Sequence, residues 1–513
     1  MGIFDRIFGR EANRTAAPRM QTRAFSAAVP DRTTSNWKTW NESSNRELRY
    51  NLRNLRGRAR DLTNNNEYAA RFLELCSQNI VGPDGVCMEP RGRNANGDLD
   101  EQNNELIEEA WEEWGRKGVC TIDGQLSWRD AQHLIVECVA RDGEFLLRPI
   151  IGKAAGNRFN FALQLIEADY LDDMFFQSYD REGAGVFMGV EVDKTHRVAA
   201  YYLLNYNPGD YGYSGSAGRE RVPADQLLHI YLPKRGHQRR GYPWLAPSMK
   251  SLYQLGDFKD SELTAARVSA AKMGYYTKND QAAPGDYDDV DANGGPVMEV
   301  EPGAFEELPF GWDVKTVDWQ HPNIGFGEFT KACLRGSAVG MGVGYNTLAG
   351  DLEGVNYSSL REGRLENTDM WRKRQRWFVD WVCQPVFSRW LDMAQLSGAI
   401  SVPARKLDGF RYPGWQPRGW QWVDPLKEVE AHRVALALGL TTRAEILAAQ
   451  GKDFGDTLEQ LKAENETMRA MGLDPAVILP GAGNAPGSAP GNNTGGESAD
   501  DDAVTAPPKG KGK

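Results

Sequence analysis

The clearest hydrophobic pattern in the chain lies between residues 245 and 276. Apolar or small residues recur there at helical spacing, with charged residues between them, at Leu252, Leu255, Leu263, Ala266, Ala270 and Met273. The pattern predicts one long helix over 245–276, which at ~1.5 Å per residue is roughly 40 Å long. Its second half is rich in alanine and offers little to a thick core. A rod with small residues along one side is suited to packing against copies of itself.

The chain before this helix alternates between helical and strand periods. Helical stripes are expected over 58–82 and around Leu106–Trp114, and Ser127 and Gly143 are expected to cap a third helix. Strand patterns follow over 144–151, 159–167, 189–204 (a hairpin turning around Asp193–Arg197) and 227–233. These elements predict a mixed α/β domain with an antiparallel sheet.

The chain changes character after the long helix. Between 276 and 320 it carries eleven acidic and two basic residues, with glycines, prolines and two short strand patterns. This composition indicates a small acidic subdomain. A helical pattern resumes over 325–341, and Gly336, Gly340 and Gly344, in and just after it, recur at every fourth position. Because a glycine inside a helix costs ~1 kcal/mol relative to alanine, this spacing suggests close approach to a neighbouring backbone.

The rest of the chain mixes helices with short aromatic strands. A loop without basic residues covers 346–356, and a long, Trp-rich helix begins at Ser358 and must kink or break at Pro385. Aromatic strands over 410–423 precede two short helices, one ending at Gly439 and one with the capping-box pair Thr442 and Glu445. From about 481 the chain is too polar and too rich in Gly and Pro to fold.

Composition and charge narrow the function classes. The 513 residues have room for two to four domains, and 41% hydrophobic residues with 15 Trp indicate a folded protein. No run is long enough to span a membrane, and the N-terminus lacks the apolar core of a secretory signal, so we expect synthesis in a cytoplasm. The net charge of −11 does not match a protein that grips DNA. It fits equally a protein past which DNA slides and one that never meets DNA.

The chain contains no recognisable catalytic motif. It has no P-loop, no H-E-x-x-H and no G-x-S-x-G, and its six cysteines form no C-x-x-C pair. We therefore expect no enzyme activity, no cofactor and no metal. The run Arg372–Arg376 is either a contact to nucleic acid or, more often for such runs, a solvated helix face.

Several longer segments resemble one family. They are VPDRTTSNW (29–37), RARDLTNNNEYA (58–69), NIVG (79–82), DGQLSWRD (123–130), ARDGE (140–144), LIEADYL (165–171), RGHQRRGYPWLAP (235–247), ELTAARVSAA (262–271), NYSSLREGRLE (356–366), WVDP (422–425) and TTRAEILAAQG (441–451). In this order, from about residue 28 to 472, the chain resembles the lambda-type portal proteins of tailed bacteriophages. It departs from the family at His196, where the hairpin turn usually has glycine; histidine tolerates a positive φ at modest cost.

The resemblance implies an α+β portal fold with wing, stem, clip and crown, and a ring, typically of twelve copies, at one capsid vertex. Double-stranded DNA would be packaged and ejected through it. Implied partners are the terminase large subunit, head–tail connector proteins, and major capsid and scaffold proteins, with no membrane. The implied location is the virion, after assembly in the host cytoplasm.

The implied division of the chain is an arm (1–45), an α/β wing (46–244), a first stem helix (245–276), an acidic clip (277–322), a second stem helix (323–343), a channel loop (344–358), a kinked long helix (359–398), strands returning to the wing (399–424), crown helices (425–480) and a disordered tail (481–513).

Candidate site residues fall into four groups. The channel-loop residues are Asp351, Leu352, Glu353, Val355 and Asn356, and the acidic clip surface is Asp286, Asp288, Asp289 and Asp291. The stem-packing residues are Ala266, Ala270, Gly336 and Gly340, and the possible DNA contacts are Arg372, Lys373, Arg374 and Arg376. Acidic clip and loop surfaces repel phosphates over ~10 Å, so DNA is expected to slide without sticking.

Two alternatives remain open. One is an enzyme, either a metal-dependent nuclease or a head-maturation protease, which would need a metal-spaced acidic cluster or a nucleophile–base motif. The other is a minor capsid or head–tail interface protein without a channel. Electron microscopy of the purified protein separates a ring with a central hole from both.

Overall fold

The computed structural model describes residues 32, 38, 40–178, 180, 183–210, 218–270, 274–278, 312–316, 325–353, 357–420, 425–449 and 454–473. They belong to two compact units, one up to Arg418 and one from Gly419, and each unit is described by itself. Most of the expected arm, the four clip aspartates and the expected tail lie outside the described residues. Among the described helices, none is long and apolar enough to cross a bilayer.

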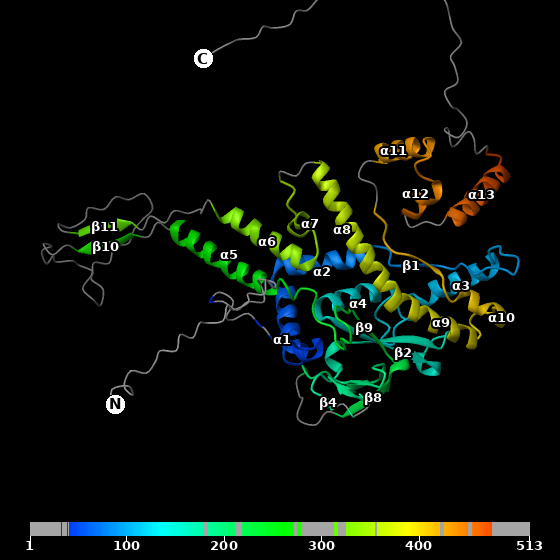
Figure 1. Cartoon of the computed structure of the whole chain (residues 1–513), viewed down its shortest axis with the longest axis horizontal. Helices are drawn as coiled ribbons and strands as arrows, with labels where there is room; N and C mark the ends of the chain where they lie inside the picture. Colours follow the sequence, from blue (N-terminus) through cyan, green and yellow to red (C-terminus); the bar gives the residue numbers. More distant parts are fainter. Residues whose placement is uncertain are drawn as a thin grey trace, which may run out of the picture. The chain divides into compact units, whose positions relative to one another are not determined.

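Two helices, not one, cover the segment 58–82. Helix α1 spans Ser44–Asn65 and α2 spans Glu67–Ile80 (Figure 1). Asn66 separates them, because its backbone is extended and its side-chain oxygen accepts hydrogen bonds from the N–H groups of Tyr68 and Ala69. Asparagine is a strong N-cap, so it begins a new helix where the periodicity alone indicated a continuous one.

An aromatic cluster forms much of the core of the first unit. It joins α3 (Glu101–Trp114), α4 (Trp128–Asp142) and α9 (Gln384–Leu396). The rings of Trp111 and Trp114 stack at 4.7 Å, and Trp390 meets Trp111 edge-on at 5.0 Å. Trp114 is fully buried and its indole N–H donates to the carbonyl of Phe161 at 2.9 Å. The predicted caps of α4 are confirmed: Ser127 forms a capping box, and Gly143 ends the helix with φ 92°.

Two antiparallel sheets replace the single predicted sheet. One has the order β3–β2–β9, with strands Phe161–Ile166, Glu144–Ile151 and Leu228–Tyr231. The other has the order β4 to β8, with strands Phe176–Gln177, Gly185–Phe187, Val190–Val192, Val198–Leu204 and Arg219–Pro223. The predicted hairpin is β6–β7, and His196 in its turn has φ 61°. His196 therefore adopts the left-handed conformation, which histidine tolerates at modest cost.

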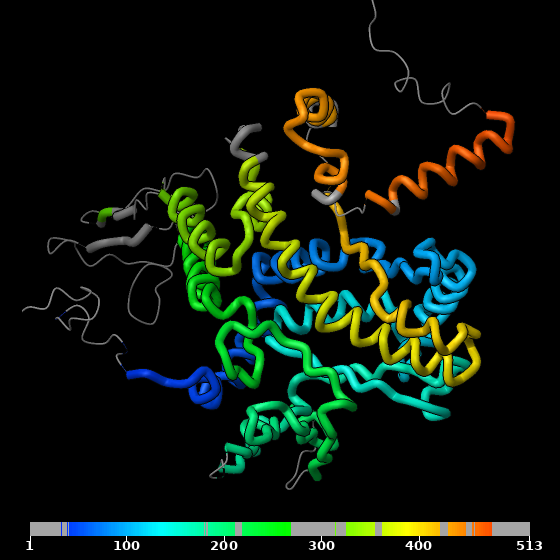
Figure 2. Tube along the Cα trace, turned by 45° about the vertical axis from the view of Figure 1, so that its right-hand side comes forward, coloured from blue at the N-terminus to red at the C-terminus, as the bar shows by residue number. Residues whose placement is uncertain are grey.

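Helices α5 (Met249–Ala270) and α6 (Phe326–Met341) lie side by side, as Figures 1 and 2 both show. Helix α5 is shorter than predicted at both ends. Gly274–Lys278 is not helical but forms strand β10, which pairs antiparallel with β11 (Trp312–Thr316). A short helix, α7 (Tyr345–Ala349), occupies part of the predicted channel loop.

The predicted kink at Pro385 takes the form of a π-helical turn. Helix α8 (Tyr357–Phe378) continues through this turn at Val379–Cys383 into α9. Pro385 has no N–H to give to the carbonyl four residues earlier, and the N–H of Gln384 reaches back five residues to the carbonyl of Val379. The wider i→i+5 spacing lets the helix pass the proline without ending.

The segment after α9 returns to the first part of the chain. It contains α10 (Ala404–Leu407) and the three-residue strand β12 (Gly414–Gln416), which pairs antiparallel with β1 (Cys87–Glu89). Residues 421–424, predicted to end this strand region, lie outside the described residues.

The described residues of the second unit form three helices, α11 (Pro425–Ala437), α12 (Arg443–Ala449) and α13 (Phe454–Ala470). The predicted capping box is present: the N–H of Thr442 donates to Glu445 at 3.1 Å, and the N–H of Glu445 donates to Thr442 Oγ1 at 3.2 Å. None of the side chains whose burial is described in this unit is buried.

Candidate functional site

Small side chains hold the base of the α5–α6 hairpin together. The hydroxyl of Ser248 donates to the carbonyl of Ser337 at 2.8 Å, and the hydroxyl of Ser337 donates to that of Ser251 at 3.3 Å. A Cβ on Gly340 would lie 2.3 Å from Ser248 Oγ, so a side chain does not fit there. Gly340, predicted to pack between copies, thus makes a close approach inside one copy.

Both helices of the hairpin also have uncovered apolar surface. Leu263 on α5 is 58% exposed and Val339 on α6 is 79% exposed. Ala266 is exposed as well, and a Cβ on Gly336 would meet nothing within 4 Å. The side chain of Ala270 lies outside the described residues. Within the described residues of one copy, this surface has no covering partner.

The loop after α6 is tied to that helix by an ion-pair network. Asp351 accepts a hydrogen bond from the Tyr345 hydroxyl at 2.7 Å and another from the N–H of Glu353 at 2.9 Å. Lys331 Nζ on α6 lies 3.1 Å from Glu353 Oε2 and 3.8 Å from Asp351 Oδ2. Leu352 between these acids is exposed, and Val355 and Asn356 lie outside the described residues.

The network shifts the pKa values of three of its side chains away from neutral pH. The hydrogen bond that Asp351 accepts from the Tyr345 hydroxyl is the main cause of the lowered pKa of Asp351. Burial and the same bond raise the pKa of Tyr345 to about 12. The pKa of Lys331 is raised by its hydrogen bond to Glu353. At neutral pH the two carboxylates of the loop face the ammonium group of Lys331 and, at longer range, the guanidinium of Arg335, both on α6, so the loop is less negative than its sequence alone indicates.

The segment that leads into α5, residues 235–248, is here named the strap. Its side chains and backbone reach several elements of the first unit. Asn45 at the start of α1 donates to the carbonyl of His237 and accepts from the N–H of Arg239, both at 2.9 Å. The N–H of Trp244 donates to Ala140 of α4 at 3.0 Å, and its ring meets Trp377 of α8 at 5.7 Å.

A buried carboxylate anchors the strap. Glu144, the first residue of β2, has no exposed surface. Its oxygens accept hydrogen bonds from Arg240 Nε at 2.7 Å, from the N–H of Gly241 at 2.7 Å and from Arg56 of α1, and His229 Nε2 of β9 lies 2.9 Å away. Burial alone would raise the pKa of Glu144, but the surrounding cations hold it well below its usual range. Burial lowers the pKa of His229, which favours its neutral form.

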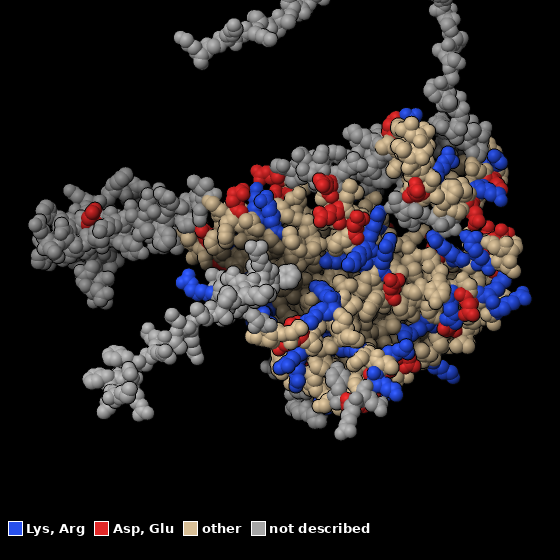
Figure 3. Space-filling model, in the orientation of Figure 1, with Lys and Arg blue, Asp and Glu red and all other residues tan. Residues whose placement is uncertain are grey.

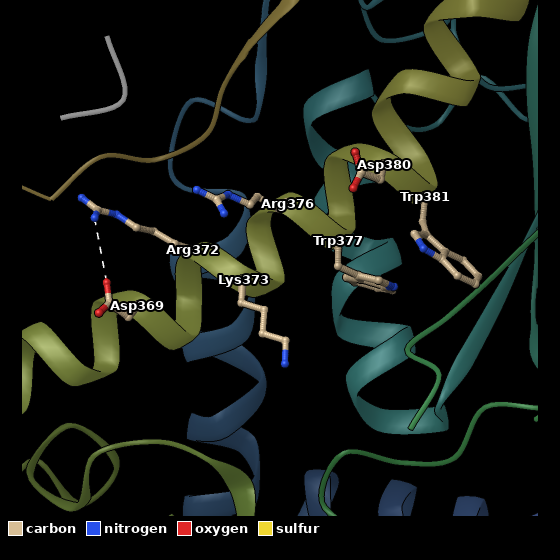
Figure 4. Close-up of a pocket in the computed structure, with 7 residues that line it drawn as sticks. All are labelled: Asp369, Arg372, Lys373, Arg376, Trp377, Asp380 and Trp381. Atoms are coloured by element: carbon tan, nitrogen blue, oxygen red, sulfur yellow. Dashed lines mark ion pairs between the residues drawn. The ribbon is translucent and has the colours of Figure 1, made fainter. Parts of the chain in front are cut away.

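Helix α8 carries a stripe of basic and aromatic side chains. Arg372 and Arg376 point to one side of the helix and Lys373, Trp377 and Trp381 to the other (Figure 4). With Asp369 and Asp380 they line an open depression of about 550 Å³. Arg372 pairs with Asp369 at 3.9 Å. Figure 3 shows basic side chains along the middle of α8, with acidic ones among them.

Arg374 is separate from the other predicted DNA contacts. Its guanidinium lies 4.7 Å from the ring of Trp244 and 4.9 Å from that of Trp371, and it donates to the carbonyl of Met341 at 3.1 Å. Burial lowers its pKa. The helical period turns residue 374 toward the core while 372, 373 and 376 face outward, so this guanidinium is a packing group.

Sequence reasoning missed the buried carboxylate of Glu144, which anchors the strap. A signal was present, because Arg56 lies at helical spacing with the buried residues Leu52 and Ala59. A charged residue on a buried face needs an opposite charge, which pairs it here with Glu144. Among the described residues, no group of three or more His, Cys, Asp or Glu side chains is placed to hold a metal ion.

Comparison with known proteins gives consistent matches. A family model described as phage portal protein, lambda family, matches residues 30–375. The chain is 33% identical over 459 residues to a probable portal protein of Halomonas phage phiHAP-1, with 88% of each chain covered. It is 22% identical over 492 residues to portal protein B of Escherichia phage lambda, with 86% of this chain and 88% of that protein covered.

Solved structures with a similar chain include the neck of an empty GTA (gene transfer agent) particle. That similarity has a TM-score of 0.40 and 14% identity, and covers 78% of this chain and 93% of the other.

Proposed function

The chain belongs to the lambda family of phage portal proteins, and on this basis we propose that it forms the ring at one capsid vertex through which double-stranded DNA is packaged and ejected. The observation that carries the proposal is the family match over residues 30–375, together with 33% identity to a probable portal protein across 88% of both chains. The proposed ring has twelve copies.

The α5–α6 hairpin supports a ring in which it is the stem. Its outward side presents Leu263, Ala266, Gly336 and Val339 without cover in one copy. A ring uses heterologous contacts, in which one side of each copy meets the opposite side of the next. Small residues let backbones approach closely, so Ala266 and Gly336 suit such a contact, whereas Gly340 is already used within the copy.

We place the loop after α6 against the DNA. In this proposal Asp351, Leu352, Glu353, Val355 and Asn356 line the channel. A negative lining repels phosphates within about a Debye length of ~8 Å at physiological salt, so DNA passes without binding. Lys331 and Arg335 of α6 reduce that negative charge.

The remaining assignments concern the two ends of the channel and the basic residues of α8. The acidic segment 277–322, including Asp286, Asp288, Asp289 and Asp291, is proposed as the clip that meets the terminase large subunit and later the connector proteins. Helices α11–α13 are proposed as the crown inside the head. Arg372, Lys373 and Arg376 are proposed as contacts to packaged DNA, because all three side chains are exposed and line the same depression on α8 (Figure 4).

Electron microscopy of the purified full-length protein tests the ring. The proposal expects symmetric particles with a central hole, and size-exclusion chromatography with light scattering then gives the copy number. The channel is refuted if the protein stays monomeric across the concentration range or forms closed particles without a hole. Either result favours the alternative of a minor capsid or head–tail interface protein.

A further inference from the structure

The strap joins parts of the first unit that are far apart in sequence. Asn45 links it to α1, and the N–H of Trp244 links it to α4. Ser248 at its end bonds to Ser337 of α6, next to Gly340. The strap thus has one end bonded to the wing elements and the other bonded to the hairpin.

The backbone in the middle of the strap has little conformational freedom. A Cβ on Gly241 would lie 2.0 Å from the carbonyl oxygen of Gly143, so the strap backbone rests directly on the turn before β2. Pro243 and Pro247 each fix one φ angle. Gln238, which is buried, accepts from the N–H of Lys234 at 3.0 Å and donates to the carbonyl of Arg240 at 2.8 Å.

Arg240 and Glu144 lock this middle part in place. Both are fully buried, and Arg240 also donates to the carbonyls of Met188 at 2.6 Å and Leu171 at 3.3 Å, which belong to the segments around the second sheet. The pair therefore joins both sheets, α1 and the strap. Buried ion pairs of this kind contribute little net stability but are retained in some proteins because they select one arrangement of the chain.

We propose that Glu144 and Arg240 are positioning residues that fix the direction in which the α5–α6 hairpin leaves the wing. Because the strap is held in place, a displacement of the hairpin is transmitted to the sheets of the wing and is not absorbed by bending of the strap. The role of the hairpin as the stem rests on the proposed function; the coupling itself is a property of the single chain.

Hydrogen exchange of the full-length protein measures the coupling. E144Q keeps the size of the side chain but removes its charge between Arg56 and Arg240. We expect exchange to rise about tenfold or more in the strap and in the first turns of α5, in addition to β2 and β9, while β7 stays protected. The matched control is E220Q, because Glu220 pairs with Arg148 on an exposed face and does not touch the strap.

The pattern of exchange decides between positioning and simple stabilisation. A residue that only stabilised its own sheet would raise exchange in β2 and β9 and leave α5 unchanged, and that result overturns the inference. So does an equal rise in α5 for E220Q. R240K provides a second variant that keeps a cation beside Glu144 but loses the fork that reaches Met188 and Leu171. It is expected to raise exchange in the same segments by a smaller factor, and protection equal to the wild type also overturns the inference.

Failure of this inference is distinguishable from failure of the proposed function. If the wild-type protein forms no ring, the portal role is refuted and the exchange pattern alone decides the coupling. If the ring forms and E144Q changes only β2 and β9, the portal role stands and the coupling is refuted.

Discussion

Reversing the two charges of the proposed channel loop gives a quantitative test of a non-adhesive lining. In each copy Asp351, Glu353 and Lys331 form a set with a net charge of −1, and Arg335 of α6 also acts on Asp351. The variant D351K/E353K replaces this set with three ammonium groups, a net charge of +3. A surface that repels phosphates thereby becomes one that attracts them.

The size of the effect follows from counterion release. Each phosphate that a lysine neutralises steepens the slope of log K against log salt concentration by ~0.9 for duplex DNA. Two new lysines per copy therefore add up to about 1.8 to the slope for each copy that engages DNA. The wild-type loop adds nothing to this slope. Fluorescence anisotropy of a labelled duplex, titrated with purified rings at several salt concentrations, measures it.

A matched control separates the loop from net charge. E105K/E109K makes the same change of charge on the exposed face of α3, at residues that form no ion pair with other described residues. We expect it to leave DNA-filled heads at the wild-type number in complementation, while D351K/E353K lowers that number and slows ejection. Equal salt slopes and equal numbers of filled heads for the two variants would show that this loop does not line the channel.

Three further predictions concern the hairpin, the buried histidine and α8. G340A should destabilise the protein by about 1–3 kcal/mol in thermal unfolding, because its methyl group would overlap Ser248. G336A should stabilise the monomer by up to ~1 kcal/mol but reduce the yield of rings in electron microscopy. Equal effects of the two variants would contradict the placement of both glycines. His229 has a lowered pKa in the folded state. The protein therefore has its full stability above the unfolded pKa of ~6.5 and loses up to ~1.4 kcal/mol of it per pH unit as the pH falls toward the folded pKa. Urea titrations of H229Q should show a smaller loss of stability between pH 6.5 and 5 than those of the wild type. R374Q should destabilise the protein by about 1–3 kcal/mol, because it removes the hydrogen bond to Met341 and the stacking on Trp244. R376Q should change the stability by no more than ~0.5 kcal/mol and lower the affinity for DNA. A larger loss of stability for R376Q than for R374Q in urea unfolding would refute the inward placement of residue 374.

Local signals in the sequence were enough to place most elements. The cap at Ser127, the left-handed Gly143 and the strand over 144–151 depend on residues close in sequence, and the structure has them where the pattern predicts. The helical period over 245–276 located α5 but not its end. The pairing of β10 with β11 ends the helix before Gly274, and that pairing joins residues nearly forty positions apart, which no helical window contains.

The candidate site was harder to predict, because charge placement depends on elements that meet only in the fold. The loop after α6 contains no basic residue, so its sequence indicates a purely acidic surface; Lys331, which offsets that charge, lies one helix earlier. The cluster 372–376 looked uniform in sequence, but the helical period sends Arg374 inward. The anchor at Glu144 needs partners from α1, β9 and the strap, and only the helical spacing of Arg56 pointed to it.

Helices α11–α13 have no buried side chain among those whose burial is described, and leucines such as Leu438 and Leu440 are largely exposed. A segment that removes so little apolar surface from water has little to offset the conformational entropy lost on ordering. A partner that covers this apolar surface would therefore stabilise the order of the segment by mass action.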